Sequence, residues 1–361
     1  MKTILFDIHQ SLGAKIVNFS CWEMPLLYKS IIQEHIHTRN FSSIFDTCHM
    51  GEFEISGKTA ASDLEKLLTQ NISNMKIHSC SYGYLLNDNG GTIDDLICFR
   101  FAEDKFWLVV NAGCRQKDAN WIKEHISQTT KFEDISDSIA KFDIQGPTSR
   151  IEIEEKLKIK LPNLNYFTFD FIELLGKKCV ISRTGYTGEF GYEIFAQIDI
   201  GKKLWSLFTE NTNIMPAGLG ARDTLRVEAG LPLYGHELSE DHSPAGVLKA
   251  RFVDIRKDFF GKERLQNDMN NPHLPILCGL KFDGRMAVRQ GDKILIDDKE
   301  AGEVTSGLFS PSLSQAIALA FIHKDKCIYG NHVKVITKNK ELIGSIESLP
   351  LYKNGTARKN L

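Results

Sequence analysis

Features that would indicate a membrane protein or a nucleic-acid-binding protein are missing from this 361-residue sequence. No stretch approaches the roughly 18 consecutive apolar residues that a membrane-spanning helix needs. Lysine plus arginine (44) and aspartate plus glutamate (46) nearly balance, and the formal net charge is -2. The sequence therefore lacks the excess of positive charge that favours binding to nucleic acid or to an anionic membrane surface.

Signals for export, disulfide bonding and metal binding are also missing. The N-terminus has only a short apolar stub before Asp7, without the apolar core and cleavage site of a signal peptide. The eight cysteines form no C-x-x-C motif, and they are Cys21, Cys48, Cys80, Cys98, Cys114, Cys179, Cys278 and Cys327. Scattered cysteines are typical of reduced thiols rather than of a disulfide framework or a zinc site. We expect a metal-free protein of the cytoplasm.

The distribution of helical and strand patterns predicts two regions. In the first, helical segments such as "AASDLEKLLTQ" and "GLGARDTLRVEAG" alternate with strands, including the predicted hairpin "CFRFAEDKFWLVVN". The linker-like stretch "NDMNNPHLP" then precedes short alternating runs such as "KILIDDKEAGEVTSG", which are typical of a small β-barrel. We expect an α+β region over residues 1–272 and a β domain over residues 273–361.

Two adjacent acids, Asp94 and Asp95, interrupt the apolar strand pattern of "NDNGGTIDDLICF". Successive strand residues point to opposite faces, so both carboxylates cannot serve one site. One interpretation is that one acid caps the "NGG" turn and the other pairs with an arginine. The alternative is that one of them faces a functional pocket, because a buried carboxylate is costly without a partner. Apolar residues flank both acids, so the alternation does not say which one faces the pocket.

Three further segments carry polar side chains in unusual settings. In "RTGYTGEFGYE" a glycine-rich hairpin turn is the simplest interpretation, and the alternative is a loop that presents Tyr186 and Glu193 to a flat heterocycle. The spacing and the lack of a following helix exclude a dinucleotide fingerprint. Arg222 and Arg226 lie at i,i+4 on a predicted helix, either in an ordinary salt-bridged face or as a fork for an anionic ligand.

The segment "FDTCHMGEF" places Asp46, Cys48 and His49 close together and suggests a cysteine nucleophile with a histidine partner. Neighbours in sequence rarely form that geometry. A single cysteine in an apolar segment is more often a small core residue, and we favour that interpretation for Cys48.

Taken together, these segments resemble the aminomethyltransferase (T-protein) of the glycine cleavage system along nearly the whole chain. The motifs that carry the resemblance, in order, are "LGAKIVNFSCWEMPLLY", "FDTCHMGEFEISG", "GGTIDDLICF", "WLVVNAG", "IQGPTS", "RTGYTGEFGYEI", "PAGLGARDTLRVEAGLPLYGHE", "DFFGKERL" and "GEVTSGLFSPSLSQAIALAFI". The resemblance implies a three-lobed, tetrahydrofolate-binding α+β fold. Its second α+β lobe would be inserted at about residues 50–138, and a β-barrel lobe would close the C-terminus.

The resemblance also implies a reaction. The one-carbon unit of the aminomethyl group on the lipoyl arm of the H-protein passes to tetrahydrofolate. The products are 5,10-methylenetetrahydrofolate, ammonia and dihydrolipoyl H-protein. Tetrahydrofolate would be the one-carbon acceptor, and neither a metal nor a flavin would be required. The expected task of the protein is to exclude water and to hold the folate N5 within attacking distance.

Site residues follow from the same resemblance. Asp95 would be the catalytic residue, holding the N10 side of folate and orienting N5, with Asp94 as a structural neighbour. The residues that match folate-binding positions are Met50, Tyr82, Asp95, Asn111, Tyr186, Glu193, Arg222 and Tyr234. Glu193 would accept hydrogen bonds from the pterin ring, and Arg358 matches more loosely a position near the glutamate end of folate.

Two cysteines depart from the family pattern. Cys48 stands where the family has serine, a substitution of similar size, and Cys21 stands where the family has glycine before Trp22. We expect the backbone around Cys21 to differ if it needs the freedom of glycine.

Two related functions are weaker alternatives. One is a free-standing folate-dependent demethylase of a small methylated substrate. The other is a non-enzymatic folate-binding factor for iron–sulfur assembly, but its K-G-C-Y-x-G-Q-E type of motif does not occur here.

Overall fold

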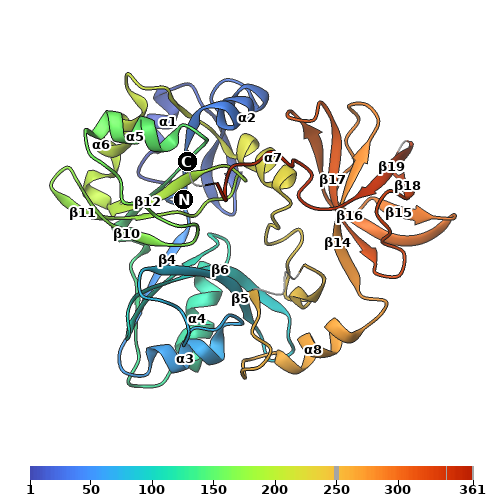
Figure 1. Ribbon diagram of the computed structural model, residues 1–361, viewed down its shortest axis with the longest axis horizontal. Coiled ribbons are helices and arrows are strands. Elements are labelled where there is room, and N and C mark those ends of the chain that lie inside the picture. Colours follow the sequence, from blue (N-terminus) through green and yellow to red (C-terminus); the bar gives the residue numbers. More distant parts are fainter. Residues whose placement is uncertain (248–251, 339, 360–361) are drawn as a thin grey trace.

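The computed structural model describes residues 1–247, 252–338 and 340–359. Three lobes, each built on its own sheet, lie around a common centre (Figure 1). Two of them mix helices and strands, and the third is a closed six-stranded barrel. The predicted α+β fold with a C-terminal β-barrel is confirmed.

The first lobe contains a six-stranded sheet with the order β10-β11-β12-β9-β3-β13. Its strands are β3 (Ser42–Asp46), β9 (Ile139–Gln145), β10 (Phe169–Leu174), β11 (Lys177–Ser182), β12 (Gly191–Gln197) and β13 (Ile214–Pro216). Its helices are α1 (Phe6–Ser11), α2 (Ile31–Asn40), α5 (Ser149–Leu157), α6 (Ile198–Thr209) and α7 (Leu219–Ala229), and a hairpin of β1 (Lys15–Phe19) and β2 (Trp22–Leu27) joins them.

Helix α6 shows why the first lobe packs as it does. Its apolar residues Ile200, Leu204, Trp205 and Phe208 recur at helical spacing, so they form one buried stripe. This stripe belongs to the same core as the inner faces of β9 and β12.

The second lobe is a five-stranded antiparallel sheet with the order β5-β6-β7-β4-β8. Its elements are β4 (Gly51–Ser56), α3 (Ala60–Leu67), β5 (Ser79–Leu86), β6 (Thr92–Ala102), β7 (Lys105–Val110), α4 (Arg115–His125), β8 (Lys131–Asp134) and η1 (Ser136–Ser138). The predicted hairpin and the helix predicted from "AASDLEKLLTQ" are present. The chain enters this lobe after β3 and returns to the first sheet at β9, so the two lobes are interleaved in sequence.

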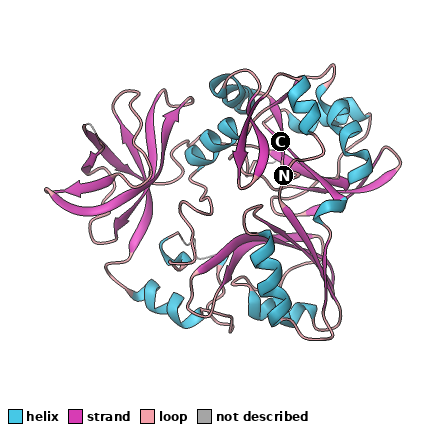
Figure 2. Ribbon diagram, turned by 180° about the vertical axis from the view of Figure 1, so that it is seen from behind, coloured by secondary structure: helices cyan, strands magenta, loops and turns pink. Residues whose placement is uncertain are grey.

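The barrel follows helix α8 (Lys262–Asn270), which crosses from the second lobe along the lower edge of the molecule in Figure 1. A short helix, η2 (Pro244–Gly246), precedes it. The barrel strands are β14 (Pro275–Phe282), β15 (Lys293–Ile296), β16 (Lys299–Ser310), β17 (Gln315–His323), β18 (His332–Ile336) and β19 (Glu341–Glu347). The described part of the barrel consists of strands and loops (Figure 2).

Helix α7 lies between the first lobe and the barrel and ends where the sequence predicts. Gly230 adopts φ 66°, a left-handed conformation that glycine tolerates better than other residues. Its backbone N–H closes the last turn by donating to Val227. Within the described residues, no helix is long and apolar enough to cross a membrane.

The turn between β1 and β2 holds Cys21 in a conformation that suits glycine. Ser20 has φ 48° and Cys21 has φ 67°, as in the two-residue hairpin turns that favour glycine at the second position. Cys21 thus keeps the left-handed backbone rather than shifting the turn.

We therefore expect Cys21→Gly to stabilise the protein by about 0.5–1 kcal/mol, because the side chain no longer opposes a positive φ. Thermal unfolding measures this change. Cys21→Ala is the matched control, since it removes the thiol but keeps the β-carbon, and it should leave the stability near that of the wild type. Equal stabilisation by both variants would contradict this explanation.

Candidate functional site

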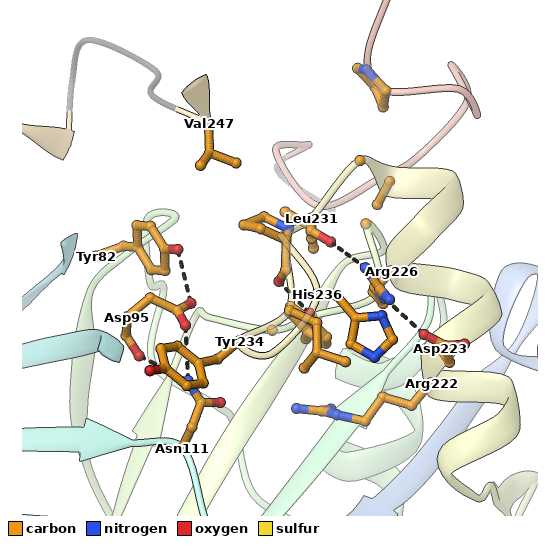
Figure 3. Close-up of a pocket in the computed structure, with 18 of the residues that line it drawn as sticks. Tyr82, Asp95, Asn111, Arg222, Asp223, Arg226, Leu231, Tyr234, His236 and Val247 are labelled. Carbon is orange, nitrogen blue, oxygen red and sulfur yellow. Dashed lines mark hydrogen bonds and ion pairs between the residues drawn. The ribbon is translucent and has the colours of Figure 1, made fainter. Parts of the chain in front are cut away.

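A cavity of about 1710 Å³ lies where the three lobes meet. Its wall includes Asp95 of β6, Glu193 of β12, Arg222 of α7, Leu308 of β16 and Arg358 of the C-terminal tail. Ligand pockets commonly measure roughly 300–1,000 Å³. This cavity is larger, so it has room for a small-molecule ligand together with part of a second molecule. Figure 3 shows part of the wall, with Asp95 and Arg222 reaching in from different lobes.

The two adjacent acids of β6 face opposite sides of the second sheet. Asp95 lines the cavity, whereas Asp94 is fully buried on the other face and accepts hydrogen bonds from Asn111. The turn before β6 is capped by the Asn87 side chain, which accepts from the Gly91 N–H (2.9 Å). The interpretation that these acids cap the turn and pair with an arginine is therefore wrong. The sheet is covered on both faces, which is why apolar residues flank both acids.

Asp95 is held by two donors at the cavity wall. The Tyr82 hydroxyl donates to its Oδ2 (2.9 Å), and the Asn111 side-chain amide donates to its Oδ1 (2.9 Å). Burial, with the neighbouring Asp94 charge, raises the pKa of Asp95 to about 7, and the two donors only partly oppose this. A carboxyl group with such a pKa can accept or release a proton near neutral pH.

Tyr82→Phe tests this electrostatic balance. The hydroxyl stabilises the ionised carboxylate, so its loss should raise the pKa of Asp95 further above 7. We expect the acidic limb of the pH profile of kcat/KM to move to higher pH by about one unit. Tyr234→Phe is the control, since that hydroxyl instead accepts from Lys117 (2.5 Å), and its acidic limb should stay in place. An unmoved or lowered limb in Tyr82→Phe would contradict the assignment.

The glycine-rich turn lies between β11 and β12, as predicted, and brings Tyr186 to the cavity. Gly188 adopts φ 79°, and a β-carbon at Gly191 would lie 2.5 Å from the Ile144 carbonyl oxygen. The Tyr186 hydroxyl donates to the Pro232 carbonyl (2.5 Å), so the ring is fixed and its aromatic surface is what it offers to a ligand.

Glu193 sits at the cavity wall in a buried network of charges. It accepts from the Lys141 ammonium and from the Thr184 hydroxyl. Lys141 also donates to Asp143 (2.7 Å), which accepts in turn from Arg222 (2.6 Å). The two cations balance the two anions, so Glu193 is oriented by the protein itself and keeps free lone pairs for a ligand donor.

The two arginines of α7 are on one side of the helix, but each has its own acidic partners. Arg222 pairs with Asp143, whereas Arg226 pairs with Asp223 (2.8 Å) and Glu237 (3.0 Å). Both line the cavity. The salt-bridged interpretation is thus correct for both, and Arg222 still has a partly exposed side chain at the wall.

The remaining predicted residues also reach the cavity. Met50 and Tyr234 line it, and the Tyr234 hydroxyl accepts from Lys117, which also pairs with Glu240 (2.6 Å). Exposed Arg358 stands in the tail, which is fixed to the glycine-rich turn by the bond from Phe190 N–H to the Thr356 hydroxyl (2.8 Å).

Matches to protein families decide the assignment. Residues 5–257 match the family described as the GCVT N-terminal domain, and residues 276–353 match the glycine cleavage T-protein C-terminal barrel domain. The chain belongs to the glycine cleavage T-protein family.

Named relatives and a solved structure agree with the T-protein family. Aminomethyltransferases of Halothermothrix orenii (37% identical, covering 97% of this chain and 99% of the relative) and Caldanaerobacter subterraneus (38%, covering 98% and 96%) are similar over their full length. The crystal structure of the glycine cleavage system aminomethyltransferase T from Bartonella henselae superposes with a TM-score of 0.91 at 29% identity, covering 97% and 98% of the two chains. These findings confirm the predicted family and its transferase activity, and they do not favour a demethylase or an iron–sulfur assembly factor.

Cys48 does not have the environment of a cysteine nucleophile. Burial raises the pKa of the Cys48 thiol well above its usual range, and the thiol donates to the Lys141 carbonyl (3.4 Å). His49, by contrast, lines the cavity with its Nδ1 buried and without a hydrogen-bond partner among the described residues. Burial lowers its pKa to about 4, so its imidazole is neutral.

The sequence did not reveal one cavity residue, His49, and one residue that contacts the cavity wall through Tyr234, Lys117. Sequence reasoning considered His49 only as a partner for Cys48, although its place beside Met50 in the same motif was a usable signal. It did not single out Lys117 at all, because a lysine on an amphipathic helix gives no sign that it reaches a tyrosine of a distant loop.

Proposed function

We propose that this chain transfers the one-carbon unit of the aminomethyl-lipoyl arm of H-protein to tetrahydrofolate. The products are 5,10-methylenetetrahydrofolate, ammonia and dihydrolipoyl H-protein. Two findings support this function together. The chain belongs to the T-protein family. Its Asp95, held by hydrogen bonds from Tyr82 and Asn111, lies on the wall of a large cavity between three lobes.

The chemistry of the cavity wall fits a folate. Tyr186 offers an aromatic surface, and the Arg222 guanidinium lies 5.0 Å from the centre of its ring. The Glu193 carboxylate can accept from ring N–H groups of a pterin. Arg358 and Lys353 supply positive charge at the exposed tail for the anionic glutamate end, while Met50 and Tyr234 add contact surface.

Asp95 would hold and orient the reacting nitrogens of the folate. Its carboxylate is fixed by Tyr82 and Asn111, which limits the orientations it can take. Its raised pKa allows it to accept a proton from a nitrogen that forms a new bond to carbon and to release that proton afterwards.

Exclusion of water is the second part of the proposed role, because an activated one-carbon unit reacts readily with water. The barrel, the C-terminal tail and the first two lobes enclose the cavity from several sides. The lipoyl arm of the partner H-protein would enter through its open side. We also propose that this takes place in the cytoplasm, a reducing compartment in which the eight free thiols of the chain would stay reduced.

Turnover with defined donors tests the function. The purified protein, tetrahydrofolate and aminomethylated lipoyl H-protein should give methylenetetrahydrofolate and ammonia in equal amounts. Small methylated amines in place of H-protein should give no product. Turnover with the small amines and none with H-protein would instead assign a demethylase.

A further inference from the structure

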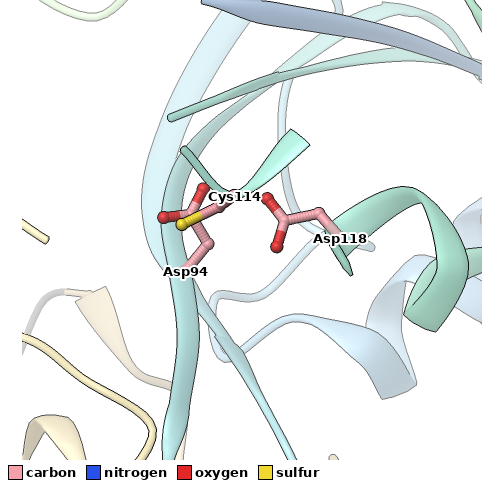
Figure 4. Close-up of side chains that lie close together, drawn as sticks. All are labelled: Asp94, Cys114 and Asp118. Carbon is pink, nitrogen blue, oxygen red and sulfur yellow. The ribbon is translucent and has the colours of Figure 1, made fainter. Parts of the chain in front are cut away.

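Behind the cavity wall, Asp118 is a buried carboxyl group that lacks a donor. It lies on α4 with 0% exposure, and neither of its oxygens has a hydrogen-bond partner among the described residues. Its carboxyl group points at Asp94 and Cys114, and one ligand atom from each of the three side chains lies within 4.8 Å of the other two (Figure 4).

Two buried carboxylates at this separation cannot both be ionised at moderate cost, since each lacks water and repels the other. The donors decide which one carries the charge. Asp94 accepts from the Asn111 backbone N–H (2.9 Å) and from its side-chain amide (2.8 Å), so it is stabilised as the anion. The Asp118 carboxyl group accepts a hydrogen bond from no described group, so Asp118 is the acid that is protonated more easily.

We propose that Asp94 and Asp118 share a single proton, resident on Asp118, and that the pair acts through Asn111 as the positioning device of Asp95. The pair then carries one negative charge in total. This acid pair stands on the geometry alone, and its consequence for the reaction rests on the function proposed above.

Asn111 is the physical link between the pair and the cavity. Its side-chain amide donates to Asp94 Oδ1 (2.8 Å), to Asp95 Oδ1 (2.9 Å) and to the Asp95 backbone oxygen (3.1 Å). The Asp94 anion therefore fixes the amide that fixes Asp95, and its charge adds to burial in raising the pKa of Asp95.

Among the other titratable groups, the Lys117 cation favours ionised Asp118, but burial and the Asp94 charge outweigh it and keep the pKa of Asp118 raised. The groups that act on the acid pair or on Asp95 are Tyr82 and Tyr84 from β5, Cys114 and Lys117 from the α4 segment, and Tyr186 from the glycine-rich turn. Burial raises the pKa of the tyrosines and of the Cys114 thiol, so they stay neutral. Lys117, the cation among them, is held by Tyr234 and Glu240.

Two isosteric variants of the full-length protein test whether the Asp94–Asp118 pair carries one negative charge or two. Asp118→Asn replaces a neutral acid with a neutral amide, so the acidic limb of the pH profile of kcat/KM should move by less than about 0.3 unit. Asp94→Asn removes the anion and should move the limb to lower pH by about one unit, with a lower kcat because Asn111 is no longer held. A fall of about one unit in Asp118→Asn would show that Asp118 is ionised and would overturn the proposal, as would an unmoved limb in Asp94→Asn.

Infrared difference spectroscopy of the resting protein tests the proton without any substrate. Wild type minus Asp118→Asn at neutral pH should show the C=O stretch of one buried, protonated carboxyl group. Absence of that band would overturn the acid pair even if the enzyme turned over normally. Conversely, the presence of the band would support the acid pair even if the protein did not catalyse the proposed reaction. Metal analysis tests whether a cation, rather than a proton, lies between the two carboxyl groups. A stoichiometric divalent cation that a chelator removes would contradict the proposal.

Discussion

Replacing Asp95 with asparagine should lower kcat for methylenetetrahydrofolate formation by about 10²–10⁴-fold, the range expected for loss of a group that moves a proton in the transition state. The amide keeps the size of the side chain and still accepts from the Tyr82 hydroxyl, so the cavity keeps its shape. The Kd for tetrahydrofolate should therefore change by less than about tenfold. Steady-state turnover together with equilibrium binding separates these two effects.

Asp223→Asn is the matched control for this experiment. Asp223 also lines the cavity and is an acid of similar type, but its carboxylate is half exposed and pairs with Arg226. Its loss should leave kcat within about threefold of the wild type, since the buried Arg226 keeps its second partner, Glu237 (3.0 Å). Equal losses of kcat in both variants, or a loss of folate binding that accounts for the whole effect in Asp95→Asn, would remove Asp95 from the chemistry.

Arg39→Met should produce the largest loss of stability, about 3–5 kcal/mol, because it leaves buried carboxylates without their cation. The Arg39 side chain is 3% exposed and pairs with Glu189 (2.7 Å) and Glu228 (2.8 Å). Glu228 also accepts from the Ser310 hydroxyl (2.5 Å) and the Ser312 N–H (3.1 Å) of the barrel segment. Arg39 thus joins α2 to the glycine-rich turn and to α7, and its partner Glu228 joins α7 to the barrel segment.

A scan of thermal unfolding measures this effect, and the expected decrease in Tm is on the order of 10 °C. Arg256→Met is the matched control, since Arg256 pairs with Asp254 (2.7 Å) but its side chain is 83% exposed. Its Tm should stay within about 1 °C of the wild type, because exposed ion pairs are screened by solvent. A similar small change in Arg39→Met would mean that water replaces the lost guanidinium.

Local sequence patterns predicted many of the helices and strands. They did not predict which strands pair with one another. The end of α7 follows from Gly230, and the barrel follows from its short alternating runs. The position of β3 between β9 and β13 does not follow from any local pattern. It arises because both partners bury apolar faces in one core, and such long-range pairing leaves no local signal.

The candidate site shows the same limit. Alternation along β6 established that Asp94 and Asp95 face opposite sides, but not which one faces the cavity. The choice of Asp95 came from the family resemblance, and the structure places Asp95 on the cavity wall. Its hydrogen-bond donors are Tyr82 on β5 and Asn111 directly after β7, and the sequence does not specify the register of these strands against β6.

A crystal structure of the protein with tetrahydrofolate would show whether Asp95 acts on the folate. We expect the pterin to lie in the central cavity near Tyr186 and Glu193. We also expect the Asp95 carboxylate to lie within hydrogen-bond distance, about 3 Å, of a nitrogen next to the one-carbon position. A folate bound outside this cavity, or one bound inside it with no nitrogen in reach of Asp95, would exclude the proposed role of Asp95.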